Sequence, residues 1–251
     1  MAALHLELEP RGAAPPEWMI ENEKDGSLLV LVPGGKFLAG GHGSSEGAAV
    51  FEVELPAFYL GISPVTNAQY LRFVEATGHR PPSHAEWRDP AKADHPVVCV
   101  NWDDAQAHCE WAGLRLPTEL EWEKGARGVD GREYPWGPVW DAAECCNRKN
   151  WCSETTARSW AYPAGTSPWG PYHVAGNVWE WCADAYDREA YARYRRGDLK
   201  APSSSGPRVL RGGSWRISGL PDNFRCAFRF YRGFDDRHDY FGFRAARTLT
   251  P

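Results

Sequence analysis

The chain has 251 residues, of which 43% are apolar and 24% are charged, and its formal net charge is −5. This composition is typical of a soluble protein with one or two domains and a sizeable core. No apolar run approaches the roughly 18 residues that a membrane-spanning helix needs, and the first residues lack the basic and apolar regions of a secretion signal. We therefore expect neither a membrane span nor signal-dependent secretion.

Large rings and turn-forming residues dominate the composition, with 13 Trp, 10 Tyr and 10 Phe beside 25 Gly and 20 Pro. Such a chain is expected to fill its core with rings on a backbone with many turns, so long helical bundles are disfavoured. Lys is scarce relative to Arg, and Gln is rare. This bias is found in GC-rich genomes and in thermostable proteins of heat-adapted hosts, and composition does not separate the two.

The first predicted elements are strands. Residues 1–27 are polar and contain Pro, and they predict an N-terminal extension of a domain that spans 28–251. Residues 28–32 form an apolar run before Pro33-Gly34-Gly35, which predicts a buried strand, and residues 51–55 alternate as in a half-exposed strand. A sheet is therefore expected early in the chain.

Three short helices are predicted next, over 66–77, 101–112 and 118–127. Each begins at a capping Thr or Asn and stops at a Gly, and the first and third carry the spacing of a capping box. From about residue 130 the chain reads as irregular, with strand-like segments only at 208–211 and 242–245. The rings of Trp179, Trp181 and Trp215 are expected to anchor this irregular backbone.

The cysteines are odd in number and include no CxxC pair, so they lack the spacing of zinc ribbons and of thioredoxin-like sites. Most are expected to be buried, inert thiols. One disulfide within the cluster Cys145, Cys146 and Cys152 is an alternative, because short loops close easily. The seven are Cys99, Cys109, Cys145, Cys146, Cys152, Cys182 and Cys226.

Charge is spread unevenly. Residues 206–251 contain nine Arg and four Asp, a net charge of +5, and the rest of the chain carries −10. Because Asp235, Asp236 and Asp239 interrupt the arginines, a balanced surface is favoured over a nucleic-acid site.

Seven short motifs follow one another over residues 28–247. They are LVPGGKF (31–37), PVTNAQY (64–70), HPVVCVNW (95–102), RLPTELEWE (115–123), GNVWEW (176–181), RGGSW (211–215) and GFR (242–244). Their order and spacing resemble the formylglycine-generating-enzyme, or sulfatase-modifying-factor, family. The resemblance implies an α+β, C-type-lectin-like fold, in which short helices pack on small antiparallel sheets with much irregular structure.

The catalytic features that the resemblance implies are missing. Formylglycine-generating members use two cysteines shortly after the RGGSW motif, where paired thiolates bind copper and activate oxygen. Here residues 216–224 contain no cysteine, and Cys226 supplies one thiol only. Sulfoxide-synthase relatives build an iron site on an additional N-terminal helical domain, which 27 residues cannot supply. We therefore expect a non-enzyme without catalytic residues.

The family resemblance also implies a calcium site within residues 172–180. Its candidate ligands here are the backbone carbonyls of Gly176 and Val178 and the carboxylate of Glu180, whereas His173 stands where the family has a carboxylate or amide. No other cofactor is expected.

Residues 216–241 contain no Glu, Lys, Gln, Met or Trp. About four of these were expected from composition, so their joint absence is roughly a one-per-cent event. The same five residues can never arise when the adenines of an AAC codon are randomised. At the end of a lectin-like domain this pattern resembles the variable protein of a diversity-generating retroelement, in which a reverse transcriptase rewrites the end of the gene.

That resemblance predicts a variable region over about 208–247, with variable positions that alternate with a constant frame. The frame consists of residues 211–215 and 225–227, Arg229, Arg237 and residues 242–244. The variable positions are Arg216, Ile217, Ser218, Phe228, Phe230, Tyr231, Asp236, His238, Asp239 and Tyr240. The rings among them are expected to be exposed as contact residues, above a buried Trp179, Trp181 and Trp215.

The resulting hypothesis is a non-enzymatic protein that displays a diversified surface to a protein or glycan target. A phage or prophage product of this kind is expected in the cytoplasm where it is made, and on a virion or cell surface only by a route without a signal. Three alternatives stay open: an oxidoreductase of the same family with a divergent site, a calcium-dependent lectin-like adhesin, and an ordinary relative whose variable positions are core residues.

Overall fold

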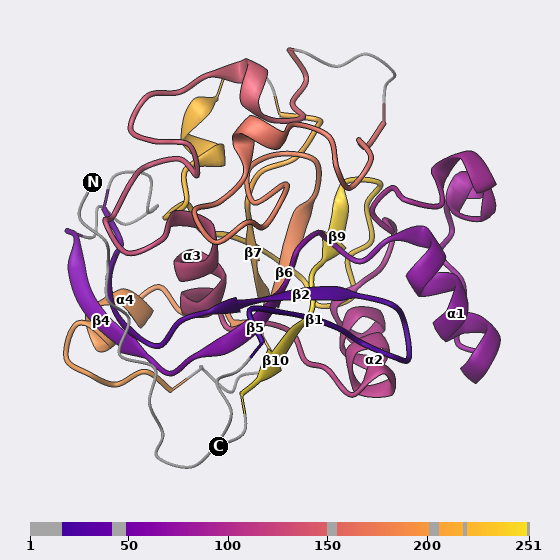
Figure 1. The fold of residues 1–251 in the computed structure, drawn as a ribbon, viewed down its shortest axis with the longest axis horizontal. Coiled ribbons are helices and arrows are strands. Elements are labelled where there is room, and N and C mark those ends of the chain that lie inside the picture. The colour runs from indigo at the N-terminus through magenta and orange to yellow at the C-terminus, as the bar shows by residue number, and fades with distance from the viewer. Residues whose placement is uncertain (1–16, 42–48, 150–154, 201–205, 218–219, 250–251) are drawn as a thin grey trace.

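The computed structural model describes residues 17–41, 49–149, 155–200, 206–217 and 220–249. Three small sheets and several short helices make up this part of the chain (Figure 1). The first sheet is antiparallel throughout, and its two edge strands come from opposite ends of the chain. Its strand order is β1 (Met19–Glu21), β2 (Leu28–Val32), β5 (Phe58–Gly61) and β10 (Ala246–Thr248).

The other two sheets frame the rest of the domain. A hairpin pairs β3 (Gly35–Ala39) with β4 (Phe51–Leu55). The third sheet has the order β8 (Phe230–Arg232), β7 (Arg208–Arg211), β6 (Trp179–Ala185) and β9 (Phe241–Phe243). Its β6 and β9 run parallel, which makes this sheet mixed. The predicted α+β class with small sheets is confirmed, with this parallel pair as an addition.

The predicted helices are confirmed together with their caps. They are α1 (Asn67–Thr77), α2 (Trp102–Ala112) and α3 (Glu119–Arg127), each with a capping box at its start. A fourth helix, α4 (Ala190–Tyr194), was not predicted. Short 3₁₀ helices lie at Ala85–Arg88, Pro90–Lys92, Ala142–Glu144, Pro163–Gly165 and Pro221–Phe224.

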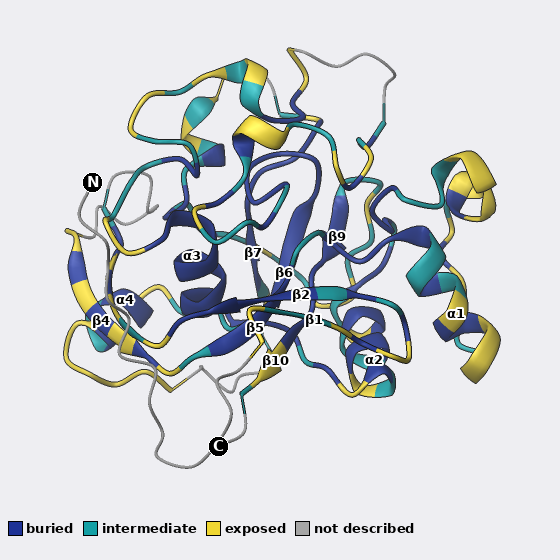
Figure 2. Ribbon diagram, in the orientation of Figure 1, coloured by how far each residue is buried: buried dark blue, intermediate teal, exposed yellow. Residues whose placement is uncertain are grey.

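Helix α3 lies at the centre of the molecule, although its sequence is rich in charge. All nine of its residues are buried, and Figure 2 shows it beside the buried strands β6 and β7, against which it packs. Charged groups buried in this way must find ionic or hydrogen-bond partners within the protein. Two of these partners, Arg229 for Glu119 and Arg211 for Glu123, come from the C-terminal segment and help to build the candidate site.

Part of the predicted N-terminal extension packs on the body of the domain. Residues 1–16 lie outside the described part, but β1 pairs with β2 in register from Met19↔Val30 to Glu21↔Leu28. Asp25 is fully buried, and its carboxylate accepts hydrogen bonds from the Asn22 amide at 2.7 Å and the Ser27 hydroxyl at 2.6 Å. The segment up to residue 27 therefore belongs in part to the body of the domain. The polar composition of this segment gave no sign of strand β1, which pairs with the apolar residues of β2.

The C-terminal strands agree closely with the sequence pattern. The strand predicted at 208–211 is β7. The strand predicted at 242–245 is β9 at Phe241–Phe243, which begins one residue earlier and ends two residues earlier than predicted. Trp179, Trp181 and Trp215 are buried. Within the described residues, no helix has the length and apolarity needed to cross a membrane.

Candidate ligand-binding surface

A pocket of about 260 Å³ opens over the third sheet and the loops that follow β7. Half of the ten predicted variable positions line it: Arg216, Ile217, Phe228, Phe230 and Tyr240. The other lining residues are Trp179, Ser214, Asn223 and Arg232. Residues as far apart in the sequence as Trp179 and Tyr240, 61 positions, thus share one concave surface.

Trp179, at the start of β6, forms the aromatic floor of this pocket. Its ring stacks on Phe230 with centroids 4.8 Å apart and lies 5.9 Å from Phe228. Trp179 is only 2% exposed, whereas Phe228, Phe230 and Tyr240 are half-buried. The expectation that the rings of the predicted variable positions are exposed is thus met by Tyr231 but not by Phe228, Phe230 and Tyr240, which pack against the core and lie as a layer between it and the solvent.

Arg216 marks the rim. Its guanidinium forms an ion pair with Asp239 at 2.8 Å, and it lies over the rings of Trp215 and Tyr240 at 5.0 and 5.6 Å. His238 is exposed and stacks on Tyr240 with centroids 4.9 Å apart. Four of the predicted positions are thus in mutual contact at one edge of the pocket.

The remaining predicted variable positions lie beside the pocket or outside the residues that the structure describes. Tyr231 is 45% exposed and stacks on Tyr186 at 4.0 Å, away from the lining. The Asp236 carboxylate accepts a hydrogen bond from the backbone of Gly233, within its own turn. Ser218 lies outside the described residues.

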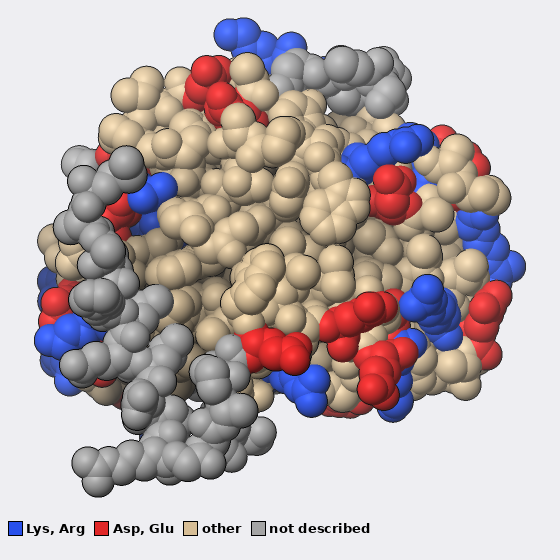
Figure 3. All heavy atoms as spheres, in the orientation of Figure 1, with Lys and Arg blue, Asp and Glu red and all other residues tan. Residues whose placement is uncertain are grey.

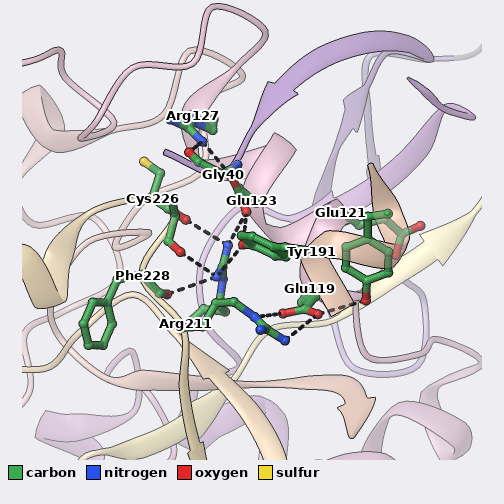
Figure 4. A network of polar contacts seen from close by, with 12 residues as sticks. Gly40, Glu119, Glu121, Glu123, Arg127, Tyr191, Arg211, Cys226 and Phe228 are labelled. Carbon is green, nitrogen blue, oxygen red and sulfur yellow. Dashed lines mark hydrogen bonds and ion pairs between the residues drawn. The ribbon is translucent and has the colours of Figure 1, made fainter. Parts of the chain in front are cut away.

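Arg211 is the central member of the frame beneath this surface. Its guanidinium is fully buried, forms an ion pair with Glu123 of α3 at 2.6 Å, and donates to the carbonyls of Cys226, Ala227 and Phe228 (Figure 4). Although burial raises the pKa of Glu123, Arg211 and Arg127 bring it below its ordinary value. The charged form is therefore favoured, and a buried cation holds the loop that leads to Phe228 and Phe230.

Two further arginines repeat this arrangement. Arg229 pairs with Glu119 through two hydrogen bonds of 2.7 and 3.0 Å, and the same carboxylate accepts from the Tyr194 hydroxyl at 2.9 Å. Arg244 pairs with Glu180 at 2.5 and 2.7 Å. We call Arg211, Arg229 and Arg244 the arginine frame.

Arg237, also predicted as part of the frame, differs from these three. Its guanidinium pairs with Asp104 at 2.7 Å, but 21% of its side chain is exposed. Asp104 also contacts His79 at 3.0 Å and caps α2. Arg237 therefore ties the variable region to α2 from the surface.

Glu180, one of the predicted calcium ligands, has both carboxylate oxygens engaged in hydrogen bonds. One carboxylate oxygen of Glu180 accepts from Arg244 and from the Trp122 indole at 2.7 Å, and the other accepts from Arg244. Glu180 is fully buried. The pairing with Arg244 opposes the predicted ligand set of Gly176, Val178 and Glu180, because this carboxylate neutralises an arginine.

The thiols suit packing rather than metal chemistry. Burial raises the pKa of Cys226 to about 12 and that of Cys145 to about 12, and it also raises the pKa of Cys99, Cys109 and Cys182. A copper site of the family type needs paired thiolates, so a single fully buried Cys226 does not fit that metal. The disulfide suggested for the cluster around Cys152 involves a residue outside the described part.

Sequence reasoning did not assign four of the lining residues to the variable surface. Trp179 is buried as expected and also forms the pocket floor, and Ser214 was assigned to the constant frame. The hydroxyl of Ser214 is buried and has no hydrogen-bond partner among the described residues. Asn223 and Arg232 lie inside the biased window of residues 216–241, so that bias was the signal that would have included them.

Comparison with known proteins places this geometry in a family. The model described as "Sulfatase-modifying factor enzyme 1-like domain" matches residues 16–249. The serine/threonine-protein kinase pkn1 of Chlamydia caviae is 36% identical over 88% of this chain, and the match spans only 38% of that protein. The formylglycine-generating enzyme of Streptomyces coelicolor is 33% identical over 86% of this chain and 88% of its own length.

Two solved structures share the fold. PvdO from Pseudomonas aeruginosa superposes with a TM-score of 0.77 at 24% identity, covering 94% of this chain and all (100%) of its own. Treponema denticola variable protein 1 has a TM-score of 0.69 at 21% identity, covering 91% and 98%. The match of the family model over nearly the whole domain, supported by these sequence relatives, shows that the chain belongs to the sulfatase-modifying factor enzyme 1-like family.

Proposed function

We propose that this protein is a non-enzymatic recognition protein, the variable protein of a diversity-generating retroelement, which binds a target through its C-terminal surface. One observation carries the proposal. The predicted variable positions and the arginine frame alternate along the same segment, yet the structure separates them by depth. Five variable side chains line one pocket, and the frame arginines are buried below it.

This separation is what a diversified surface requires. Core positions respond to a change of a single methylene, so a variable residue must lie where its neighbours tolerate exchange. The loop after β7 has few strand partners, and Arg211 satisfies three of its carbonyls instead. Side chains on that loop can then change while the backbone stays in place. The shared fold with a Treponema denticola protein named as variable agrees with this proposal.

Two matched display libraries test the proposal. One randomises Arg216, Ile217, Phe230, Tyr231, His238 and Tyr240 to residues that AAC codons can reach, and the other randomises the arginine frame in the same way. We expect most members of the first library to fold and to yield binders to an arbitrary protein target, whereas most members of the second fail to fold. The proposal is wrong if the two libraries fold equally rarely.

Sequencing of the flanking DNA is an independent test. A near-copy of the last coding stretch, with adenines at the codons of the variable positions and a reverse transcriptase gene beside it, is the expected result. A genomic neighbourhood with neither feature would contradict the assignment to a retroelement. Whether the protein binds ligands in general would then be decided by the display libraries alone.

Oxidation of a substrate cysteine is the second candidate function, and the identity to a formylglycine-generating enzyme favours it. The buried Cys226 and the missing second thiol oppose it. Purified protein supplied with copper and a sulfatase-type cysteine peptide is expected to leave that peptide unchanged in mass. Formation of formylglycine would replace the recognition proposal with an enzymatic one.

A further inference from the structure

The pocket over Trp179 has the dimensions of one side chain. Its volume of about 260 Å³ lies below the range of roughly 300–1,000 Å³ typical of small-molecule sites. Interfaces between proteins commonly place one large anchor residue in such a pocket and surround it with weaker contacts. The size therefore favours a single anchor of a larger partner over a free metabolite.

The lining defines the chemistry of that anchor. Phe228, Phe230 and Tyr240 supply aromatic walls above the Trp179 floor, which suits a ring packed edge-to-face or offset. The buried hydroxyl of Ser214 lines the same pocket and has no partner among the described residues. A buried hydroxyl is stabilised when it gains a hydrogen bond, so the matching ring carries a polar atom, as tyrosine and tryptophan do.

Charge at the rim adds a second requirement. Two arginines, Arg216 and Arg232, line the pocket, and no carboxylate does. Arg216 shares its charge with Asp239. Arg232 lies over the Phe230 ring at 4.2 Å and, within the described residues, forms no ion pair with an acidic side chain. A partner that brings a carboxylate to Arg232 gains a charge-assisted hydrogen bond at the edge of an apolar pocket.

We propose that the pocket accepts a tryptophan or tyrosine side chain of a protein partner, with an aspartate or glutamate next to it in sequence. This inference rests on the proposed recognition function and names the chemistry of the target. Aromatic anchoring supplies most of the contact, and Arg232 selects the sign of the neighbouring charge. A glycan is less suited, because the lining has few polar groups for the many hydroxyls of a sugar.

Four short acetylated peptides test the inference: one with a central Trp-Glu, and three in which this pair becomes Trp-Lys, Ala-Glu or Ala-Lys. Binding to the full chain is measured at low salt by saturation-transfer NMR, which detects weak complexes. We expect the Trp-Glu peptide to bind about tenfold more tightly than the Trp-Lys peptide, the ratio that about 1.4 kcal/mol produces. Both alanine peptides are expected to show no binding.

Charge reversal at the rim sharpens the test. Arg232→Glu should invert the preference, so that the Trp-Lys peptide binds more tightly than the Trp-Glu peptide. Arg247→Glu is the matched control, since Arg247 is an exposed arginine of β10 outside the pocket, and it should keep the native preference. Thermal melts of both variants near that of the native protein establish that the fold is intact.

The outcomes separate this inference from the function on which it rests. Equal binding of the Trp-Glu and Trp-Lys peptides overturns the charge selection, and absence of binding by both overturns the anchor. If the library of surface variants still yields protein binders, the proposed function stands without this anchor. Displacement of the Trp-Glu peptide by neutral oligosaccharides would assign the pocket to glycans and also overturn the inference.

Discussion

Two groups of arginines in the C-terminal segment differ in depth although they alternate in sequence. Arg211, Arg229 and Arg244 are at most 2% exposed and pair with Glu123, Glu119 and Glu180, whereas Arg216 and Arg232 lie at the surface beside rings. The difference comes from elements far away in the chain, because α3 and β6 supply the buried carboxylates. Arginine thus has two roles in this segment: the buried arginines hold the chain through ion pairs, and the surface arginines lie where they can contact a partner.

This comparison shows where variation is tolerated. A buried ion pair fixes both partners, because removal of one leaves the other charged and without solvent. An exposed arginine loses little when it is replaced, since water takes over its hydrogen bonds. On the face shown in Figure 3, positive and negative side chains lie close together around the periphery. Among the described residues of that face, the basic side chains form no continuous surface of the kind that nucleic-acid binding needs.

The largest expected effect is loss of a frame arginine. Arg229→Ala or Arg244→Ala should lower the free energy of unfolding by about 3–5 kcal/mol, because Glu119 or Glu180 is left buried and unpaired. Urea unfolding measures this loss. Arg232→Ala is the control and should change stability by about 0.5 kcal/mol or less. A larger loss of stability for the Arg232 variant than for the Arg229 variant would mean that Arg232, and not Arg229, supports the fold.

Acid should destabilise the protein through a buried histidine. Burial lowers the pKa of His173 to about 4, so the unfolded chain binds more protons between about pH 6.5 and pH 4. The free energy of unfolding should fall across this window as pH decreases, by at most about 3 kcal/mol from this residue. Unfolding curves at several pH values measure the slope.

His173→Asn isolates that contribution. The φ angle of residue 173 is 57°, a left-handed conformation that asparagine adopts readily. The variant should reduce the slope between pH 6.5 and 4, and the buried His108 should retain part of it, since burial also lowers its pKa to about 4. An unchanged slope would show that His173 does not titrate in this range.

A smaller effect is expected where a variable ring touches the core. Phe230 is half-buried and stacks on Trp179 at 4.8 Å. Phe230→Ser should cost about 1–2 kcal/mol, between the cost of an exposed residue and that of a fully buried ring. The thermal melt measures it, with Tyr231→Ser as the more exposed comparison. A loss as large as that of Arg229→Ala would place Phe230 in the frame.

The smallest effect on stability should come from the exposed variable positions. Arg216→Ser, Tyr231→Asn and His238→Asp should each change the free energy of unfolding by about 0.5 kcal/mol or less. Binders selected against the native surface should nevertheless lose affinity for the triple variant. If the triple variant keeps both its affinity for these binders and its melting temperature, these positions take no part in recognition.

Local signals explain why the first half of the fold was predictable. Thr66 and Gly78 bound α1, and the alternation of residues 51–55 matches β4. Capping and alternation depend on neighbours within a few residues, so one sequence contains them. The same holds for the biased window of residues 216–241, which indicated most of the pocket lining before any contact was known.

Contacts between distant segments were not predictable in this way. β6 is buried on both faces and lacks the alternation of a surface strand, and the 19–21 strand is too short to stand out. The pairing of Arg229 with Glu119 spans 110 positions. The pairing of Arg244 with Glu180, which opposes the calcium prediction, is another such contact, because no local pattern shows it.

The late position of β9 and β10 has a consequence during synthesis. β9 lies beside the central strand β6, and β10 completes the first sheet by pairing with β5. Both follow the proposed variable positions in the chain, so two sheets stay incomplete until the ribosome has translated that stretch. A premature stop within that stretch would leave an unfolded chain for proteases. Codons that keep a final cytosine never encode a stop, so a gene rewritten only at its AAC adenines always supplies the strands that close the fold.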